Sequence, residues 1–138
     1  MIVCLDSSVA IRIAFGTTGR LRQWSKVTQL VASVLVEVEC FRVLDQERLH
    51  RALTDEKVAE VSEGIRALLA RAEVIDLSPP ILARACASFP TRLATLDALH
   101  VSSALLWKQL REPKLVFATH DRQQAAGARA VGLTVIGV

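Results

Sequence analysis

The chain has 138 residues, of which 51% are hydrophobic, and this length and composition fit one compact domain, residues 1–138, with a substantial core. Its 17 lysines and arginines exceed its 14 aspartates and glutamates, and the net charge of +3 allows a polyanionic partner without requiring one. No apolar run reaches the roughly 18 residues of a membrane span, and the amino terminus lacks signal-peptide features, so we expect a cytoplasmic protein with no membrane partner.

The first part of the chain predicts two strands, each followed by a helix. Residues 2–5, IVCL, form a short β-branched run that is typical of a buried strand. Asp6 then offers N-cap chemistry for a helix over 7–15, which a glycine-containing segment ends. A second strand is predicted over 28–32, and the absence of glycine and proline over 33–53 predicts a long helix after it.

The middle of the chain predicts another helix, a third strand and two further helices. Thr54 is followed by two acids and then by apolar residues at helical spacing, which marks a helix start. Residues 73–77, EVIDL, predict a strand, and Ser78 before two prolines predicts the capped first turn of a helix. A longer helix is predicted over 95–110, with Thr95 as its cap.

The last part of the chain predicts a strand, a helix and a closing strand. Residues 114–118, KLVFA, are strand-like, and Asp121 with Gln124 resembles a capping box for a helix ending near Gly132. Residues 133–138 then predict the last strand. Because these strands are apolar throughout and are separated by helices, the sequence predicts an α/β fold, a three-layer α/β/α sandwich around a central parallel sheet.

Acidic residues fall where predicted strands end or where the following helices begin. Asp6 and Asp121 each follow a strand, and Asp97 lies in a first helical turn. Glu37 or Glu39 lies early in the long helix after the second strand. Each has an ordinary explanation as a cap, a first-turn acid or an ion-pair partner. Together they would share the carboxyl-end rim of the sheet, where a divalent cation could offset their repulsion.

Carboxylate ligands are those that Mg²⁺ or Mn²⁺ prefers, whereas zinc would want cysteine or histidine at close spacing. The histidines lack such spacing and are interpreted as surface or core residues: His50, His100 and His120. The cysteines are odd in number and are interpreted as core residues of a reducing compartment: Cys4, Cys40 and Cys86. An acid cluster without a phosphate-binding loop suits hydrolysis of a phosphodiester by metal-activated water.

Four motifs stand in order along essentially the whole chain. They are LDSSVAI, SVLVEVECFR, TLDALHVSSALL and FATHDRQQAAGARAVGL. In this combination they resemble the PIN-domain family, in particular the VapC-type ribonuclease toxins of toxin–antitoxin pairs. The resemblance implies a PIN-like sandwich, an endoribonuclease dependent on Mg²⁺ or Mn²⁺, an RNA substrate, a cognate antitoxin and a homodimer.

The resemblance also implies the residues of the site. Carried over by motif, the catalytic and metal-binding quartet is Asp6, Glu39, Asp97 and Asp121. Glu39 is preferred to Glu37 because the family pattern has a serine six places before the acid and an arginine three places after it, which Ser33 and Arg42 match. On a helix the two glutamates point about 200° apart, so one of them can face the site. Arg42 is also expected to pair with Glu39 when no metal is bound.

Other side chains are secondary candidates. Hydroxyls beside the acids could contact a water or a phosphate: Ser7, Ser8 and Thr119. Exposed cations are expected to contact RNA: Arg12, Arg20, Arg22, Lys26 and Arg92. Many relatives have an arginine where this chain has Ala94, with Arg92 nearby instead. Trp24 and Trp107 are interpreted as packing residues.

The sequence leaves two other functions open. One is a catalytically inactive PIN-like binding module, which would keep the fold without turnover. The other is a haloacid-dehalogenase-like phosphotransfer enzyme, which also has an aspartate after its first strand but wants a second one two residues later, where Ser8 stands. A receiver domain would want a pair of acids after that strand, and LDSS offers one.

Overall fold

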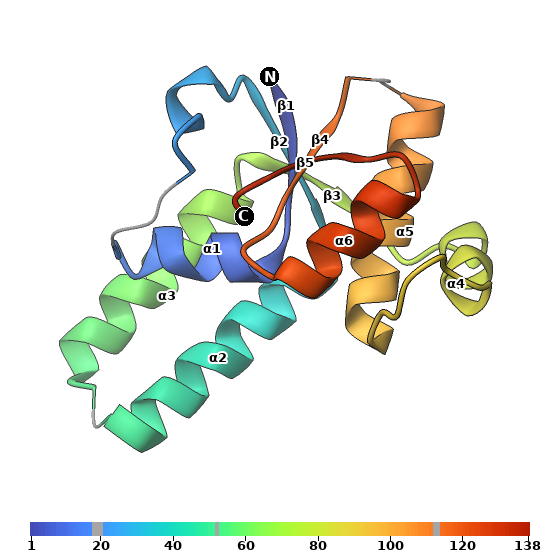
Figure 1. Ribbon diagram of the computed structural model, residues 1–138. Coiled ribbons are helices and arrows are strands. Elements are labelled where there is room, and N and C mark those ends of the chain that lie inside the picture. The colour runs from blue at the N-terminus through green and yellow to red at the C-terminus, as the bar shows by residue number, and fades with distance from the viewer. Residues whose placement is uncertain (18–20, 52, 112–113) are drawn as a thin grey trace.

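The computed structural model describes residues 1–17, 21–51, 53–111 and 114–138, and its helices and strands follow the predicted order (Figure 1). The strands are β1 (Ile2–Leu5), β2 (Gln29–Ser33), β3 (Ala72–Ile75), β4 (Val116–Ala118) and β5 (Thr134–Ile136). The helices are α1 (Ser7–Ala14), α2 (Leu35–Arg51), α3 (Asp55–Leu69), α4 (Pro79–Cys86), α5 (Thr95–Leu110) and α6 (Arg122–Ala130), with a short 3₁₀ helix η1 (Trp24–Lys26). The observed bounds differ from the predicted ones only near the element ends.

The strands of the described chain form one five-stranded sheet in the order β3-β2-β1-β4-β5, and every neighbouring pair is parallel. β1 lies at the centre, where Val3 pairs with Leu30 of β2 and with Val116 of β4. Asp6 continues this contact past the strand, because its amide donates to the carbonyl of Ala118 at 2.9 Å. The predicted parallel sheet is confirmed, and β1 and β4 end side by side.

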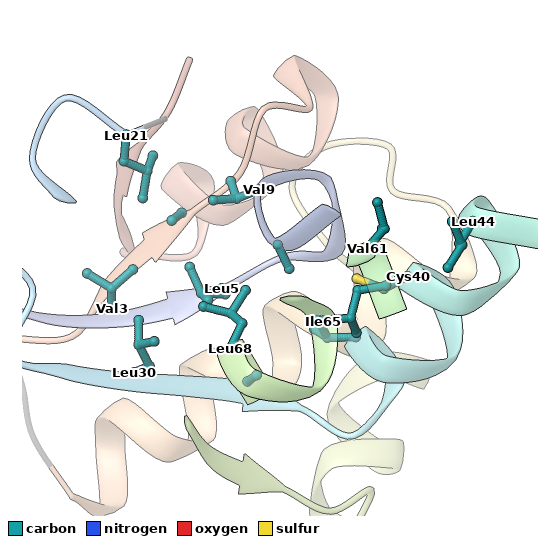
Figure 2. Close-up of a cluster of buried hydrophobic side chains, with 14 residues drawn as sticks. Val3, Leu5, Val9, Leu21, Leu30, Cys40, Leu44, Val61, Ile65 and Leu68 are labelled. Carbon is teal, nitrogen blue, oxygen red and sulfur yellow. The ribbon is translucent and has the colours of Figure 1, made fainter. Parts of the chain in front are cut away.

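Helices cover both faces of the sheet, so the predicted three-layer sandwich is confirmed (Figure 1). Alternate residues of β1 point to opposite faces, as a pleated strand requires. Val3 and Leu5 pack against α1, α2 and α3, where Ile65 of α3 belongs to the same buried cluster (Figure 2). Cys4 points the other way, into a cluster with Val101 of α5 and with residues of α6.

The cysteines divide between core and surface. Cys4 and Cys40 are buried as predicted, and burial raises the pKa of each thiol to about 12. Cys86 is exposed at the end of α4, so the prediction of a core position is wrong there. The physical reason is that α4 is a short helix at the margin of the fold, with Ile81 as its buried residue. None of the described helices combines the length and the apolar character needed to cross a membrane.

Candidate active site

Asp6 lies directly after β1 and is 4% exposed. Its Oδ2 accepts hydrogen bonds from the amide of Ser8 at 3.1 Å and from the Ser8 hydroxyl at 2.6 Å. Thr119 Oγ1 donates to the same oxygen at 3.2 Å, and Gln124 Nε2 donates to Oδ1 at 3.0 Å. A buried carboxylate is tolerable when it is hydrogen-bonded in this way, so donors from α1, α6 and the segment after β4 fix its position.

Two hydroxyls tie the segment after β4 to this carboxylate. The Ser8 hydroxyl accepts from the amide of His120 at 2.9 Å and lies 3.4 Å from Thr119 Oγ1. Thr119 Oγ1 accepts from the amide of Asp121 at 3.0 Å. Ser8 and Thr119 therefore lie in contact with the acids as predicted, whereas Ser7 makes no side-chain hydrogen bond among the described residues.

Asp121 caps α6, and its Oδ1 accepts from the amide of Gln124 at 2.7 Å. Of the two hydrogen bonds of the predicted capping box, only the one from the Gln124 amide to the Asp121 side chain forms. The other is missing because the Gln124 side chain reaches Asp6 instead of turning back to Asp121. Gln124 is 1% exposed, and its Oε1 is buried with no hydrogen-bond partner in the described part of the chain. Gln124 is thus a buried polar residue at the site that the sequence pattern assigned only to helix capping.

Asp97 lies in the first turn of α5 and is partly buried. The N-cap position belongs to Ala94 and carries no side-chain hydrogen bond, so the prediction that Thr95 caps this helix is wrong. Burial raises the pKa of Asp97, and the charges of Asp121 and Asp6 raise it further, against smaller opposing effects of the Ala94 backbone and a histidine. Asp97 is therefore close enough to Asp121 and to Asp6 for their charges to repel its own.

Glu39 completes the group from α2. Its Oε2 lies 2.5 Å from Nε2 of His100, which is 2% exposed on α5 and also lies 3.9 Å from Asp6 Oδ1. Burial disfavours the charged ring, but the hydrogen bond to Glu39 and the neighbouring acid charges outweigh it and raise the pKa of His100. His100 is buried, as its interpretation as a surface or core residue allows, but its hydrogen bond to Glu39 was not predicted. The available signal was its place three residues after Asp97, one turn along the same helix face.

Glu37 is exposed, so the structure separates the two glutamates as predicted for a helix. The predicted ion pair between Arg42 and Glu39 is wrong, because Arg42 pairs with Asp45 at 3.2 Å. Asp45 also binds Arg48 at 2.9 Å on the outer face of α2. Glu39 is turned inward to the histidine, while Arg42 stays with the surface charges.

The cations that the sequence predicts to contact RNA lie on exposed segments where the structure describes them. Arg12 stands in the last turn of α1 and lines a groove of about 640 Å³ with residues of α1, α2 and the segment before α3. Arg92 is exposed, and its carbonyl accepts from Gln123 Nε2 at 2.7 Å, which ties its loop to the start of α6. Arg22 and Lys26 are also exposed. Arg20 lies outside the described residues.

The two tryptophans pack as predicted. Trp107 is 8% exposed in the core between α5 and the sheet, and its indole Nε1 donates to Glu73 Oε1 at 2.9 Å. Trp24 is partly buried against the cluster on the other face of the sheet. Both rings are therefore engaged within the fold.

The chemistry of the acidic group suits a hard divalent cation, since its donors are carboxylate oxygens. Within the described ranges, no three His, Cys, Asp or Glu side chains are assembled as a ready coordination shell. Mg²⁺ is usually held by only one or two carboxylates, with waters filling its other positions. The donor set fits such an ion, and the repulsion that raises the pKa of Asp97 is what a cation would offset.

Comparison with known proteins identifies the family. A family model described as the PIN domain matches residues 3–130. The chain belongs to the PIN domain family. The predicted family is confirmed, and the haloacid-dehalogenase-like alternative, which already lacked its second aspartate at Ser8, loses its basis. No curated protein matches the chain significantly.

Solved structures share this PIN fold at low sequence identity. FitAB bound to an IR36 DNA fragment aligns with a TM-score of 0.72 and 15% identity, covering 98% of this chain and 93% of that one. VapBC2 from Rickettsia felis, bound to a DNA fragment from its promoter, gives 0.65 and 15%, covering 98% and 97%. PAE2754 from Pyrobaculum aerophilum gives 0.64 and 20%, covering 98% and 83%. These likenesses show that the fold is shared over nearly the whole chain.

Proposed function

We propose that this PIN-domain protein is a metal-dependent endoribonuclease and the toxin of a type II toxin–antitoxin pair. The observation that carries the proposal is the meeting of acids from separate elements at the carboxyl-end rim of the sheet. Asp97 lies within repelling distance of Asp6 and Asp121, and Glu39 lies beside them through its contact with His100. A rim of carboxylates in a parallel α/β fold suits binding of hard cations at a phosphodiester.

In this proposal Asp6 and Asp97 are the principal ligands of Mg²⁺ or Mn²⁺, and Glu39 and Asp121 complete the site directly or through water. When bound, the ion supplies a water of lowered pKa as nucleophile and polarises the scissile phosphate. Ser8 and Thr119 hold the Asp6 carboxylate in place through their hydroxyls. No side chain has to act as the nucleophile.

The RNA backbone is proposed to contact exposed cations, in particular Arg12 and Arg92. Arg92 stands on a loop that Gln123 ties to the start of α6. Gln123 follows the Asp121 cap by two residues. Each lost phosphate contact reduces the salt dependence of nucleic-acid affinity. We therefore expect Arg92→Ala to weaken RNA binding and to flatten its salt dependence, while the exposed Arg129→Ala on the last turn of α6 serves as a matched control.

A small antitoxin is the proposed partner, with the toxin itself as a homodimer. The support is that structural relatives carry the names FitAB and VapBC2, and the latter is bound to DNA from the promoter of both its components. The antitoxin would cover the acidic rim. Expression of the protein alone should slow growth, whereas expression of the Asp97→Asn variant should not.

Incubation of the purified protein with total RNA and Mn²⁺ tests the activity directly. We expect cleavage that EDTA abolishes and that the Asp97→Asn variant lacks. RNA binding without cleavage, in Mg²⁺ as well as in Mn²⁺, would favour the inactive PIN-like binding module instead. Equal growth of cells that express either form would contradict the toxin proposal, and a milder nuclease would remain.

A further inference from the structure

We propose that His100 is the positioning residue that fixes the carboxylate of Glu39 in the acidic site. This inference rests on the proposed function, because that function assigns Glu39 to the site. The contact that carries it is the hydrogen bond between His100 Nε2 and Glu39 Oε2, at 2.5 Å. The two residues are 61 positions apart in sequence and come from different helices, α5 and α2.

The hydrogen bond joins the two helical layers. α2 packs with α1 and α3 through Cys40 and its neighbours, whereas α5 belongs to the cluster on the opposite face of the sheet. Glu39 and His100 meet near the end of β1, since His100 Nε2 also lies 3.9 Å from Asp6 Oδ1. His100 therefore sets where the acid from one layer stands relative to the acid from the central strand.

Glu39 has no second hydrogen-bond anchor in the described part of the chain. Within the described residues, His100 is its one hydrogen-bond partner, and Arg42 is engaged by Asp45. The Glu39 side chain is 21% exposed, so without the histidine it could turn toward solvent. Glutamate has several freely rotating bonds, and a partner locked in the core is what restricts them. His100 is such a partner because its side chain is 2% exposed.

The hydrogen bond also defines what His100 does not do. A carboxylate accepts, so Nε2 carries the proton and has no lone pair with which to bind a cation. The ring is too deeply buried to touch a polynucleotide. His100 thus acts through Glu39, in the way that outer partners of metal-binding carboxylates hold their ligands, and loss of such partners typically costs about 10–100-fold in metal affinity.

Mn²⁺ affinity of the full chain without RNA provides the test, measured by calorimetry alongside thermal unfolding. His100→Phe keeps a ring but removes the donor, and we expect it to weaken Mn²⁺ binding by about 10–100-fold. His100→Gln can still donate from a similar position, so it should restore most of the affinity. His50→Gln makes the same change on an exposed histidine of α2 and should leave Mn²⁺ binding unchanged.

A double variant separates positioning from general stability. If His100 acts through Glu39, the loss of affinity caused by His100→Phe should disappear in the Glu39→Gln background. A folded His100→Phe protein with wild-type Mn²⁺ affinity would overturn the inference, as would an equal loss in both backgrounds. If this variant does not fold, His100→Asn, whose shorter amide falls short of Glu39, replaces it with the same expectations.

The outcomes for the two proposals differ. Wild-type protein that binds no Mn²⁺ would overturn the proposed metal site and the positioning role together. Wild-type binding with unchanged affinity in the folded His100→Phe variant would overturn the positioning role alone. Binding that weakens as expected, without any RNA cleavage by the wild type, would support the role of His100 and contradict the proposed nuclease.

Discussion

The end of β1 and the first turn of α5 bring aspartates to the same rim but hold them differently. Asp6 is buried and accepts hydrogen bonds from Ser8, Thr119 and Gln124. Asp97 is partly buried and lies in the field of two other carboxylates, and burial together with that field raises its pKa. The fold therefore supplies hydrogen-bond donors to the Asp6 carboxylate, whereas the repulsion at Asp97 is what a bound cation would offset.

Asp97→Asn removes the charge that lies close to two other carboxylates, and it gives the largest expected effect. RNA cleavage should fall by more than the roughly 100-fold that loss of an outer-shell partner costs, because a direct ligand is removed. The metal-free variant should nevertheless be more stable than wild type, since one repelling charge is gone. Single-turnover cleavage and urea unfolding in EDTA measure the two effects.

Asp76→Asn is the matched control for this prediction, because Asp76 is an exposed aspartate after β3. It should change neither cleavage nor stability. An Asp97→Asn protein that cleaves RNA at the wild-type rate in saturating Mg²⁺ would remove α5 from the site. Destabilisation of the metal-free protein by Asp97→Asn would show that the fold stabilises the Asp97 carboxylate through its own contacts, as we expect at Asp6.

A further pair of variants tests which glutamate of α2 belongs to the site: Glu39→Gln and Glu37→Gln. Glu39→Gln should reduce cleavage and Mn²⁺ affinity by about 10–100-fold, because a neutral amide is a poor substitute for a carboxylate near the cation. Glu37→Gln should leave both unchanged, since that side chain is exposed. A severe loss only in the Glu37 variant would reverse the assignment of the two glutamates.

Asp6→Ala tests how much the hydrogen bonds to the Asp6 carboxylate contribute to the stability of the fold. The substitution leaves the buried donors of Ser8, Thr119 and Gln124 without their acceptor, which should cost about 1–3 kcal/mol of unfolding free energy. Asp6→Asn should cost less, because the unpartnered Oε1 of Gln124 can accept from the new amide after a flip of its own. Urea unfolding at constant pH compares them, and equal stability of all three proteins would contradict the hydrogen-bonded anchor.

The sequence predicts the rim because its causes are local. Asp6 and Asp121 each follow an apolar run, and strand ends in a parallel sheet meet on one edge. The partners of the acids escape prediction because they depend on contacts distant in sequence. Gln124 follows a local capping pattern, but its side chain donates a hydrogen bond to Asp6, 118 positions away. His100 lacks metal-type spacing, and its contact with Glu39 follows from α2 and α5 meeting at the site.

The pH dependence of the metal-free protein provides the smallest and final expected effect. The pKa of Asp97 is raised above its ordinary value of 3.8, so its contribution to stability is fully present below 3.8 and is lost as pH rises through the raised value. The pKa of His100 is raised above 6.5, so its contribution is present below 6.5 and is lost as pH rises further. Both contributions have the same sign.

Metal-free wild-type protein should therefore lose stability as pH rises above 6.5, through deprotonation of His100 beside Glu39, Asp6 and Asp97. Unfolding in urea with EDTA at a series of pH values measures this slope. His100→Gln cannot titrate and should flatten the profile above 6.5. Asp97→Asn should flatten the part that begins above 3.8 and should reduce the slope above 6.5 by a smaller amount, because the Asp97 charge is the last of the causes that raise the pKa of His100. A wild-type profile that is already flat above 6.5 would mean that Glu39 and its neighbours do not hold the charged ring.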